Sequence, residues 1–570
     1  MLLNLKLLKA IIKLKINKFL LVSFLFFFCL NSQANQIFGD NPTFRKKQNN
    51  ANFVSQIGDE NKDSKWKNIF QDKAYLDIKE FIEALPSKSP NAVVQKMILN
   101  FLTTKKTFNG ELISLDEDKK ILEILINKLF ETGRINEIEY YYSQSTNLRS
   151  NEFILVKMIE GNFLRNRHEE ACKILQNKAT ETPPEIFGKV IVICDILNNK
   201  YEQAKLGLLL LKEQNKPGDS FFIDLAYSLM SEENISGSKN IKKKLEEIKS
   251  LNPIIMSSLQ FADISPNYDQ VEKLNTSGLL FILSNPAVDT DIKIFCSELL
   301  VKQGRVENDF LSEAYMLPRY DNADLENSLK LYKTLSPSKA RPLLYQSVVM
   351  EKNNEVKFQK IIALLKVSII DNLFSQISNL VLNFVDTEYI TESKEQILLI
   401  SRMYQSQKDY IQANMTLNKI ESEDDIDLIF RELSIEISKH LDGIPVNDFI
   451  VEERIKNLSK IKDLNSQKYQ KIITNLILNY QLNQNMYNSI SKFNFFSNEK
   501  LNNNSLNNLF LAESFSKKND LFNSMKIFFK TIGNKSLENL SLIDTYKILV
   551  ILKNLGFNDE LKEIAINLIE

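Results

Sequence analysis

From Trp66 to the end of the chain, apolar residues recur three and four positions apart. This spacing places them on one face of an α-helix, so each run predicts a helix that buries one stripe. Short polar breaks such as Glu131-Thr132-Gly133 separate the runs. Helices of about 10 to 16 residues joined by such short turns must lie antiparallel to their neighbours. The pattern therefore predicts an all-α fold made of helix pairs.

The pattern repeats between residues 155 and 215. The segment Leu164–Ala171 (LRNRHEEA) aligns with Leu197–Ala204 (LNNKYEQA) at an offset of 33 residues. The same offset pairs Gly161 with Cys194. A repeat of this length is typical of stacked helix pairs. We interpret Ala171 and Ala204 as the points where the two helices of a pair cross, because a small side chain lets the helix axes approach to about 8–10 Å.

Two later windows of the sequence carry residues in the order small, aromatic, small, large. The intervals between these residues are 3, 9 and 4 positions in both windows. The windows resemble the tetratricopeptide family of helix-turn-helix repeats, although the family's helix-ending proline is missing. The resemblance implies an α-solenoid, a superhelix of antiparallel helix pairs, and proteins of that family mostly bind peptides or protein partners. The windows consist of Ser401, Tyr404, Ala413 and Leu417, and of Ala512, Phe515, Ser524 and Phe528.

Composition supports helices over sheets. The 570 residues include only 14 Gly and 13 Pro, where average usage would give about 40 and about 28. Sheets need such residues in their turns, whereas helix interiors exclude them. Lys and Arg number 72, as do Asp and Glu, so net charge gives no reason to expect nucleic acid as a partner.

The chain divides by pattern into five parts. Residues 1–34 are expected to be a signal peptide, 35–64 a flexible polar lead-in, 66–230 an N-terminal repeat segment, 231–290 an irregular joint, and 291–570 a C-terminal repeat segment. The joint is expected because a proline disfavours helix at the preceding residue. Three prolines fall there: Pro253, Pro266 and Pro286.

The signal peptide is expected from a lysine-rich start, the apolar run FLLVSFLFFFCL at 19–30, and small residues before a cleavage point after Ala34. Retention as an uncleaved anchor is the alternative, but the run is shorter than the roughly 20 residues that span a bilayer. Lipoprotein processing at Cys29 is disfavoured by Phe28, which is not small. Contact with a membrane is expected only through this segment, if it is retained.

Three cysteines follow the expected cleavage point: Cys172, Cys194 and Cys296. An oxidising compartment would permit a bond between Cys172 and Cys194, which fall in successive predicted helices. Spacing alone does not show that their Cα atoms come within about 7 Å. Burial without a bond is the ordinary interpretation, and a Cys172–Cys194 disulfide is the alternative.

No pattern indicates catalysis or a cofactor. The two histidines, His168 and His440, are isolated, and no spacing assembles a metal site. The phosphate-binding, dinucleotide-binding, zinc-protease and serine-hydrolase motifs are absent. We therefore expect neither an enzyme nor a cofactor.

These features lead to one functional hypothesis and two alternatives. We expect an exported scaffold of the bacterial periplasm or cell envelope that binds a protein or peptide along a concave helical surface. The alternatives are a structural or accessory part of an envelope machine and, less favoured, a cell-wall glycan enzyme. The residues expected to pack the repeats are Gly161, Leu164, Ala171, Cys194, Leu197, Ala204, Tyr404, Ala413, Phe515 and Phe528.

Overall fold

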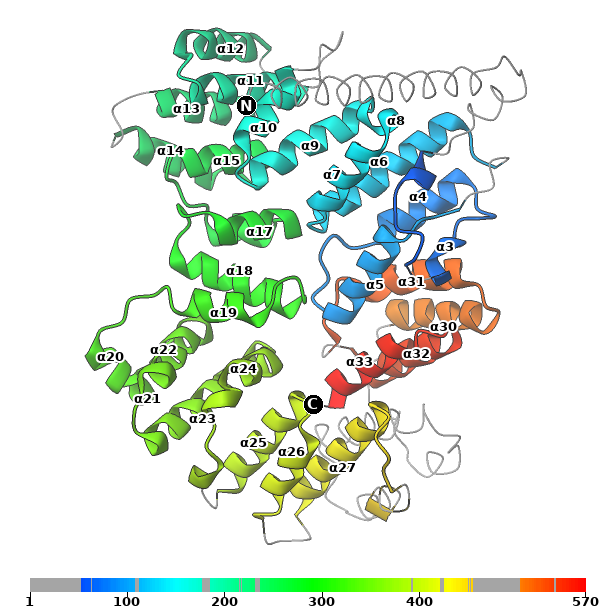
Figure 1. Ribbon diagram of the computed structural model, residues 1–570, viewed down its shortest axis with the longest axis vertical. Helices are drawn as coiled ribbons and strands as arrows, with labels where there is room; N and C mark the ends of the chain where they lie inside the picture. The colour runs from blue at the N-terminus through cyan, green and yellow to red at the C-terminus, as the bar shows by residue number, and fades with distance from the viewer. Residues whose placement is uncertain are drawn as a thin grey trace, which may run out of the picture. The chain divides into compact units, whose positions relative to one another are not determined.

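The computed structural model is helical throughout the residues it describes, and no β-strand occurs among them (Figure 1). The prediction of an all-α fold is confirmed for these residues. The described residues are 53–62, 64–107, 112–176, 185–214, 216, 218–230, 236–390, 393–420, 425–447, 449, 451, 453–454, 503–537 and 540–569.

Several of the N-terminal helices begin at a residue whose side chain caps the helix. For example, Ser114 caps α6. The side chains of Ser114 and Glu117 each accept a hydrogen bond from the other residue's backbone N–H, which satisfies two N–H groups at the helix start. This group comprises η1 (Val54–Gln56), α3 (Ser64–Lys67), α4 (Tyr75–Ala84), α5 (Ala92–Thr103), α6 (Leu115–Glu131), α7 (Ile135–Gln144), α8 (Thr146–Arg149), α9 (Glu152–Leu164), α10 (His168–Gln176), α11 (Glu185–Leu197) and α12 (Tyr201–Gln214).

The segment 231–290, expected to be an irregular joint, contains packed helices instead. Pro253 occupies the first turn of α15, where its missing N–H costs nothing, and Asn252 caps that helix. The prolines therefore start or separate helices here. The middle group comprises α13 (Asp219–Met230), α14 (Ser236–Glu246), α15 (Pro253–Phe261), α16 (Tyr268–Glu272), α17 (Thr276–Ser284), α18 (Thr290–Lys302), α19 (Asn308–Tyr315), α20 (Asn322–Glu326), α21 (Ser328–Leu331), η2 (Tyr332–Thr334) and α22 (Pro337–Met350).

The C-terminal helices continue the same construction of short-linked pairs. In four of these pairs the second helix begins four residues after the first one ends. The group comprises α23 (Asn354–Ile370), α24 (Phe374–Val381), η3 (Leu382–Phe384), η4 (Thr387–Tyr389), α25 (Lys394–Ser406), α26 (Tyr410–Leu417), α27 (Ile426–Leu441), α30 (Asn503–Lys517), α31 (Leu521–Ile532), α32 (Leu542–Asn554) and α33 (Asn558–Ile569).

One kind of turn recurs between paired helices. The residue two positions after the helix end has a positive φ, as in Gly133 (79°), Asn166 (57°) and Asn199 (59°). The next N–H then bonds back into the last helical turn, as from Arg167 to the Asn162 carbonyl at 2.8 Å. This satisfies carbonyls that the ending helix leaves without partners. The three positive-φ residues lie at the offset of the repeat seen in the sequence.

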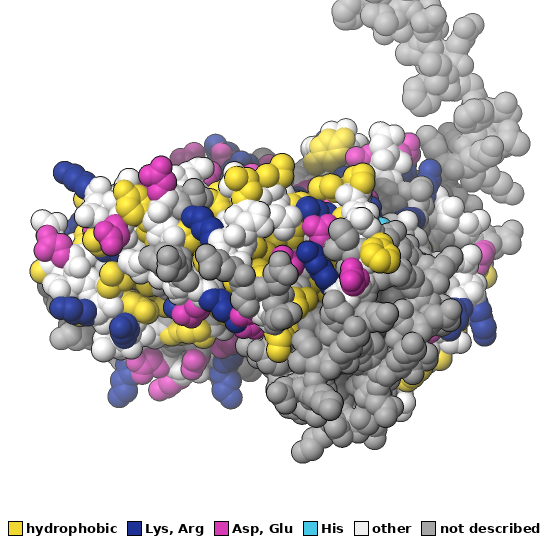
Figure 2. Space-filling model, turned by 90° about the horizontal axis from the view of Figure 1, so that it is seen from below, with side chains coloured by type: hydrophobic (Ala, Val, Ile, Leu, Met, Phe, Trp, Pro, Cys, Tyr) yellow, Lys and Arg dark blue, Asp and Glu magenta, His cyan; other side chains and the backbone are white. Residues whose placement is uncertain are grey.

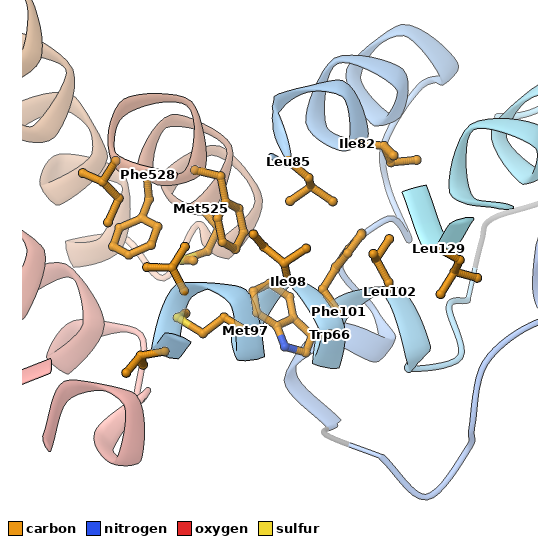
Figure 3. Packing of buried hydrophobic residues seen from close by; sticks show 14 of the residues in the cluster. Trp66, Ile82, Leu85, Met97, Ile98, Phe101, Leu102, Leu129, Met525 and Phe528 are labelled. Carbon is orange, nitrogen blue, oxygen red and sulfur yellow. The ribbon is translucent and has the colours of Figure 1, made fainter. Parts of the chain in front are cut away.

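The first and last described helices share one hydrophobic core. Trp66 is 1% exposed, and its ring lies 5.2 Å from that of Phe557 and 5.6 Å from that of Phe101. Figure 3 shows Met525 and Phe528 in the same cluster as Met97, Ile98 and Phe101. Helix α33, the last described helix, packs on both α27 and α5. The series of contacts from helix to helix therefore returns to the N-terminal helices, and we call this feature the closure of the series.

The expected lead-in, 35–64, ends earlier than predicted. Val54 and Ile57 are 0% and 3% exposed and belong to the main core. The carboxylate of Asp118 accepts hydrogen bonds from the N–H groups of Phe53 and Val54, which fixes the chain there. The chain is therefore already packed at Phe53, and residues 35–52, like the expected signal peptide at 1–34, lie outside the described residues.

Candidate binding surface

The repeat predicted in the sequence has the same helix boundaries in successive pairs. Helices α9 and α11 end at Leu164 and Leu197, and their partners α10 and α12 begin at His168 and Tyr201. The pair α6/α7 has the same turn one repeat earlier, from Glu131 to Ile135. Three consecutive pairs therefore present corresponding residues in corresponding places, and each position can be compared with its equivalents.

The position shared by Gly161 and Cys194 joins each pair to the pair before it. A Cβ atom on Gly161 would lie 2.6 Å from Cγ2 of Ile135 in α7, so only glycine fits there without movement. At the equivalent point Cys194 forms a disulfide with Cys172 of α10, with the Cα atoms 5.8 Å apart. The ordinary interpretation of two unbonded cysteines does not hold. The remaining cysteine, Cys296, is unbonded and buried, and burial raises the pKa of its thiol.

The alanines expected at the helix crossings are fully buried. Ala171 and Ala204 are both 0% exposed, and Leu164 is 5% exposed. Leu197 differs, because 39% of it is exposed. The structure thus buries the small residues and the first leucine, and it leaves the second leucine partly open to solvent.

The two later windows pack through hydroxyl contacts between their helices. Ser401 in α25 donates to the carbonyl of Ala413 in α26 at 3.0 Å, and Ser524 in α31 donates to that of Ala512 in α30 at 2.8 Å. In each pair the serine of one helix thus contacts the alanine of the other where the two helices cross. Of the residues expected to pack there, Ala413 is 0% exposed, Tyr404 and Phe528 are buried, and Phe515 is half-buried.

The outward face of α12 is apolar. Leu206, Leu209 and Leu210 are 61%, 51% and 54% exposed, and they lie three and four residues apart, on one side of the helix. Ala204, Leu208 and Leu211 fill the opposite, buried side. Sequence periodicity missed this face, because five leucines within six residues do not reveal which of them point to the core.

Comparison with the preceding repeats shows that this face is particular to α12. One repeat earlier the equivalent sequence positions hold Lys173, Gln176 and Asn177, and two repeats earlier they hold Tyr140, Ser143 and Gln144. The described members of both sets are exposed. Solvent therefore meets mainly polar residues on α7 and α10 and three leucines on α12. An alignment of the three repeats that compares the residues at outward-facing positions would have revealed the leucine face of α12 from the sequence.

Lysines line one edge of this leucine stripe. At 100° per residue, Lys205 and Lys212 fall on the same edge, and Gln203 and Gln214 fall on the other. Lys205 pairs with Glu202 at 2.8 Å, but both side chains are at least half exposed, so the pair contributes little. Elsewhere charges of both signs are interspersed, as on the face shown in Figure 2.

A polar cavity lies where six segments of the chain meet. Its volume is about 320 Å³, and no Asp or Glu is among the described residues that line it. Its cations are engaged within the protein: Lys302 donates to the Asp371 carbonyl at 2.9 Å, and Arg402 stacks on Phe374 at 4.4 Å. We regard the cavity as a junction between helices.

The histidines and other metal-ligating residues do not form a site among the described residues. The described residues contain no group of three His, Cys, Asp or Glu side chains placed to hold a metal ion. His168 lies against Phe261, with Nε2 3.1 Å from Oγ of Ser257, and burial lowers its pKa. His440 lies in the last turn of α27. Among the described helices, none has the length and apolar character needed to cross a bilayer.

Comparison with known proteins gives no assignment. No protein-family model, no curated protein and no solved structure matches this chain.

Proposed function

We propose that this protein is an exported, non-enzymatic scaffold of the bacterial periplasm or cell envelope that binds a protein or peptide partner. Its helix pairs form a tetratricopeptide-like stack. The observation that carries the proposal is the leucine face of α12, since apolar residues so exposed, at positions where the preceding repeat is polar, are typical of an interaction surface.

The disulfide supports the location. Cys172 and Cys194 are bonded across two neighbouring repeats, and such structural disulfides persist in oxidising compartments and are rare in the cytosol. This agrees with the signal peptide expected at residues 1–34, whose cleavage after Ala34 would leave the described helices intact.

Cell fractionation with N-terminal sequencing tests export. The expected result is a periplasmic or envelope chain that begins at Asn35, with Cys172 and Cys194 protected from thiol reagents until reductant is added. A cytosolic chain that retains its first 34 residues and has free thiols would overturn the proposal. Crosslinking and affinity capture from envelope extract then test binding, with a discrete partner expected.

A further inference from the structure

We infer that the outward face of α12 is the docking site for an amphipathic helix of the partner, and that this helix carries leucine-type residues beside an acidic edge. The inference rests on the proposed function, which it makes more specific. It names the surface, the mode of binding and the charge of the partner.

The shape of the face fits a helix. Leu206, Leu209 and Leu210 form a stripe along one side of α12, with Leu206 and Leu210 one turn apart. A partner helix with its own apolar stripe would cover the leucines along that line, as helices do when they dock by residues three and four apart. The buried residues on the opposite side of α12 hold the stripe in place.

The partner's charge follows from the edge of the stripe. Lys205 and Lys212 lie seven residues apart, two helical turns, on the same edge, and both are exposed. Two carboxylates on the facing edge of the partner would meet both ammonium groups. Because the pair between Lys205 and Glu202 is exposed and weak, Lys205 can exchange that carboxylate for one from the partner.

A lipid surface fits the face less well. Glu202 and Glu213 lie at the two ends of the stripe, near its centre line, and both are exposed. Immersing the leucines in a bilayer would carry both carboxylates into its anionic interface, which is unfavourable. A membrane-binding helix would instead carry cations on both sides of its apolar stripe.

A second copy of the chain also fits less well. If two α12 helices packed antiparallel, each lysine edge would face the lysine edge of the other copy. If they packed parallel, Glu202 and Glu213 would each face their own counterparts. Both arrangements place like charges together, which disfavours self-association.

The test uses the full mature chain and two synthetic helical peptides with the same leucine stripe, one with glutamates along one edge and one with lysines there. Fluorescence anisotropy should show binding of the acidic peptide, with the basic peptide about tenfold weaker. Replacing the stripe by the residues of the preceding repeat (Leu206→Lys, Leu209→Gln, Leu210→Asn) should weaken binding by at least about tenfold. Lys212→Glu should reduce the preference for the acidic peptide.

A matched control lies on α26, where Ile411 and Met415 are 73% and 56% exposed and one turn apart. The double variant Ile411→Lys, Met415→Gln should bind the acidic peptide as the unaltered chain does. The stripe variant should keep its circular dichroism spectrum and melting temperature, because its three substitutions are at exposed positions.

Several outcomes would overturn the docking site: equal binding by the stripe variant, equal binding of both peptides, tighter binding to phosphatidylglycerol/phosphatidylethanolamine vesicles than to the acidic peptide, or a dimer in sedimentation that the stripe variant abolishes. Undiminished capture of a partner by the stripe variant would also reject the site while leaving the scaffold function intact. A cytosolic chain with free thiols would reject the scaffold function, whatever the peptides show.

Discussion

Arg341 is a buried cation that donates three hydrogen bonds to two carboxylates. It is 1% exposed and donates two hydrogen bonds to the carboxylate of Glu298 in α18, at 2.8 and 2.7 Å, and a third to Asp371 at 2.7 Å. Tyr315 in α19 donates to the same Glu298 at 2.8 Å. Burial lowers the pKa of Arg341, but the hydrogen bonds and charge of Glu298 outweigh it, so the pKa lies above its usual value.

Removing only the cation should therefore be costly. We expect Arg341→Met to lower the free energy of unfolding by about 4 kcal/mol, because it leaves the carboxylate of Glu298 buried without its counter-charge. The double variant Glu298→Gln, Arg341→Met should lose less, since neither charge remains. Urea denaturation followed by circular dichroism measures both. Losses that simply add, with the double variant the less stable, would contradict this view of the cluster.

Glu513 is a second partly buried charge. Its side chain is 10% exposed and pairs with Lys547 of α32 and with Lys517 at 2.8 Å. Burial raises the pKa of Glu513, but these hydrogen bonds and charges more than offset it, so the pKa lies below its usual value of 4.5.

A lowered carboxyl pKa stabilises the fold above the unfolded-state pKa, and this stabilisation is lost as pH falls through the folded-state pKa. Glu513→Gln should therefore destabilise the protein by about 3 kcal/mol near neutral pH. The difference from the unaltered chain should shrink as pH falls below 4.5. Denaturation curves at a series of pH values measure it, and a difference independent of pH would assign the effect to packing.

Helix pairs are the elements that the sequence predicted best. Their apolar periodicity is local, and most turns between them place Gly or Asn where a positive φ is required, as at Gly133, Asn166 and Asn199. Prolines misled the prediction at 231–290, because a proline ends one helix and starts the next equally well. A proline can therefore mark either the end or the start of a helix. At Pro253 the capping residue Asn252 shows that a helix starts.

The crossing of α11 and α12 offers a direct test of these pairs. Ala204 is 0% exposed, so Ala204→Leu must force a larger side chain between two packed helices. We expect a loss of about 2 kcal/mol from overpacking. The control on the same helix is Leu209→Ala, at a position 51% exposed, which should change stability by less than about 0.5 kcal/mol. An unchanged melting temperature for Ala204→Leu would count against the crossing.

Apolar periodicity along the chain does not reveal two features of the structure. The closure of the helix series depends on pairs such as Glu80 and Lys526, which lie 446 residues apart and leave no local periodicity. The α12 face depends on the rotation of one helix, which decides whether Leu208 or Leu209 points to the core. The disulfide was partly predictable. The sequence shows the two cysteines, but only the structure shows that their Cα atoms lie 5.8 Å apart.

The closure can be observed through the single tryptophan of the chain. Trp66 is 1% exposed and lies against Phe557 of the α32–α33 turn, so its emission reports whether the first and last described helices are packed together. We expect Phe557→Ala to cost about 4 kcal/mol and to shift native-state emission to longer wavelength, because a cavity opens beside the indole. Phe358→Ala in α23, where Phe358 is 1% exposed in a separate core cluster, should cost as much without moving the emission. If both variants moved it equally, Trp66 would be reporting general loosening, and the packing of the N-terminal helices on α33 would lose its support.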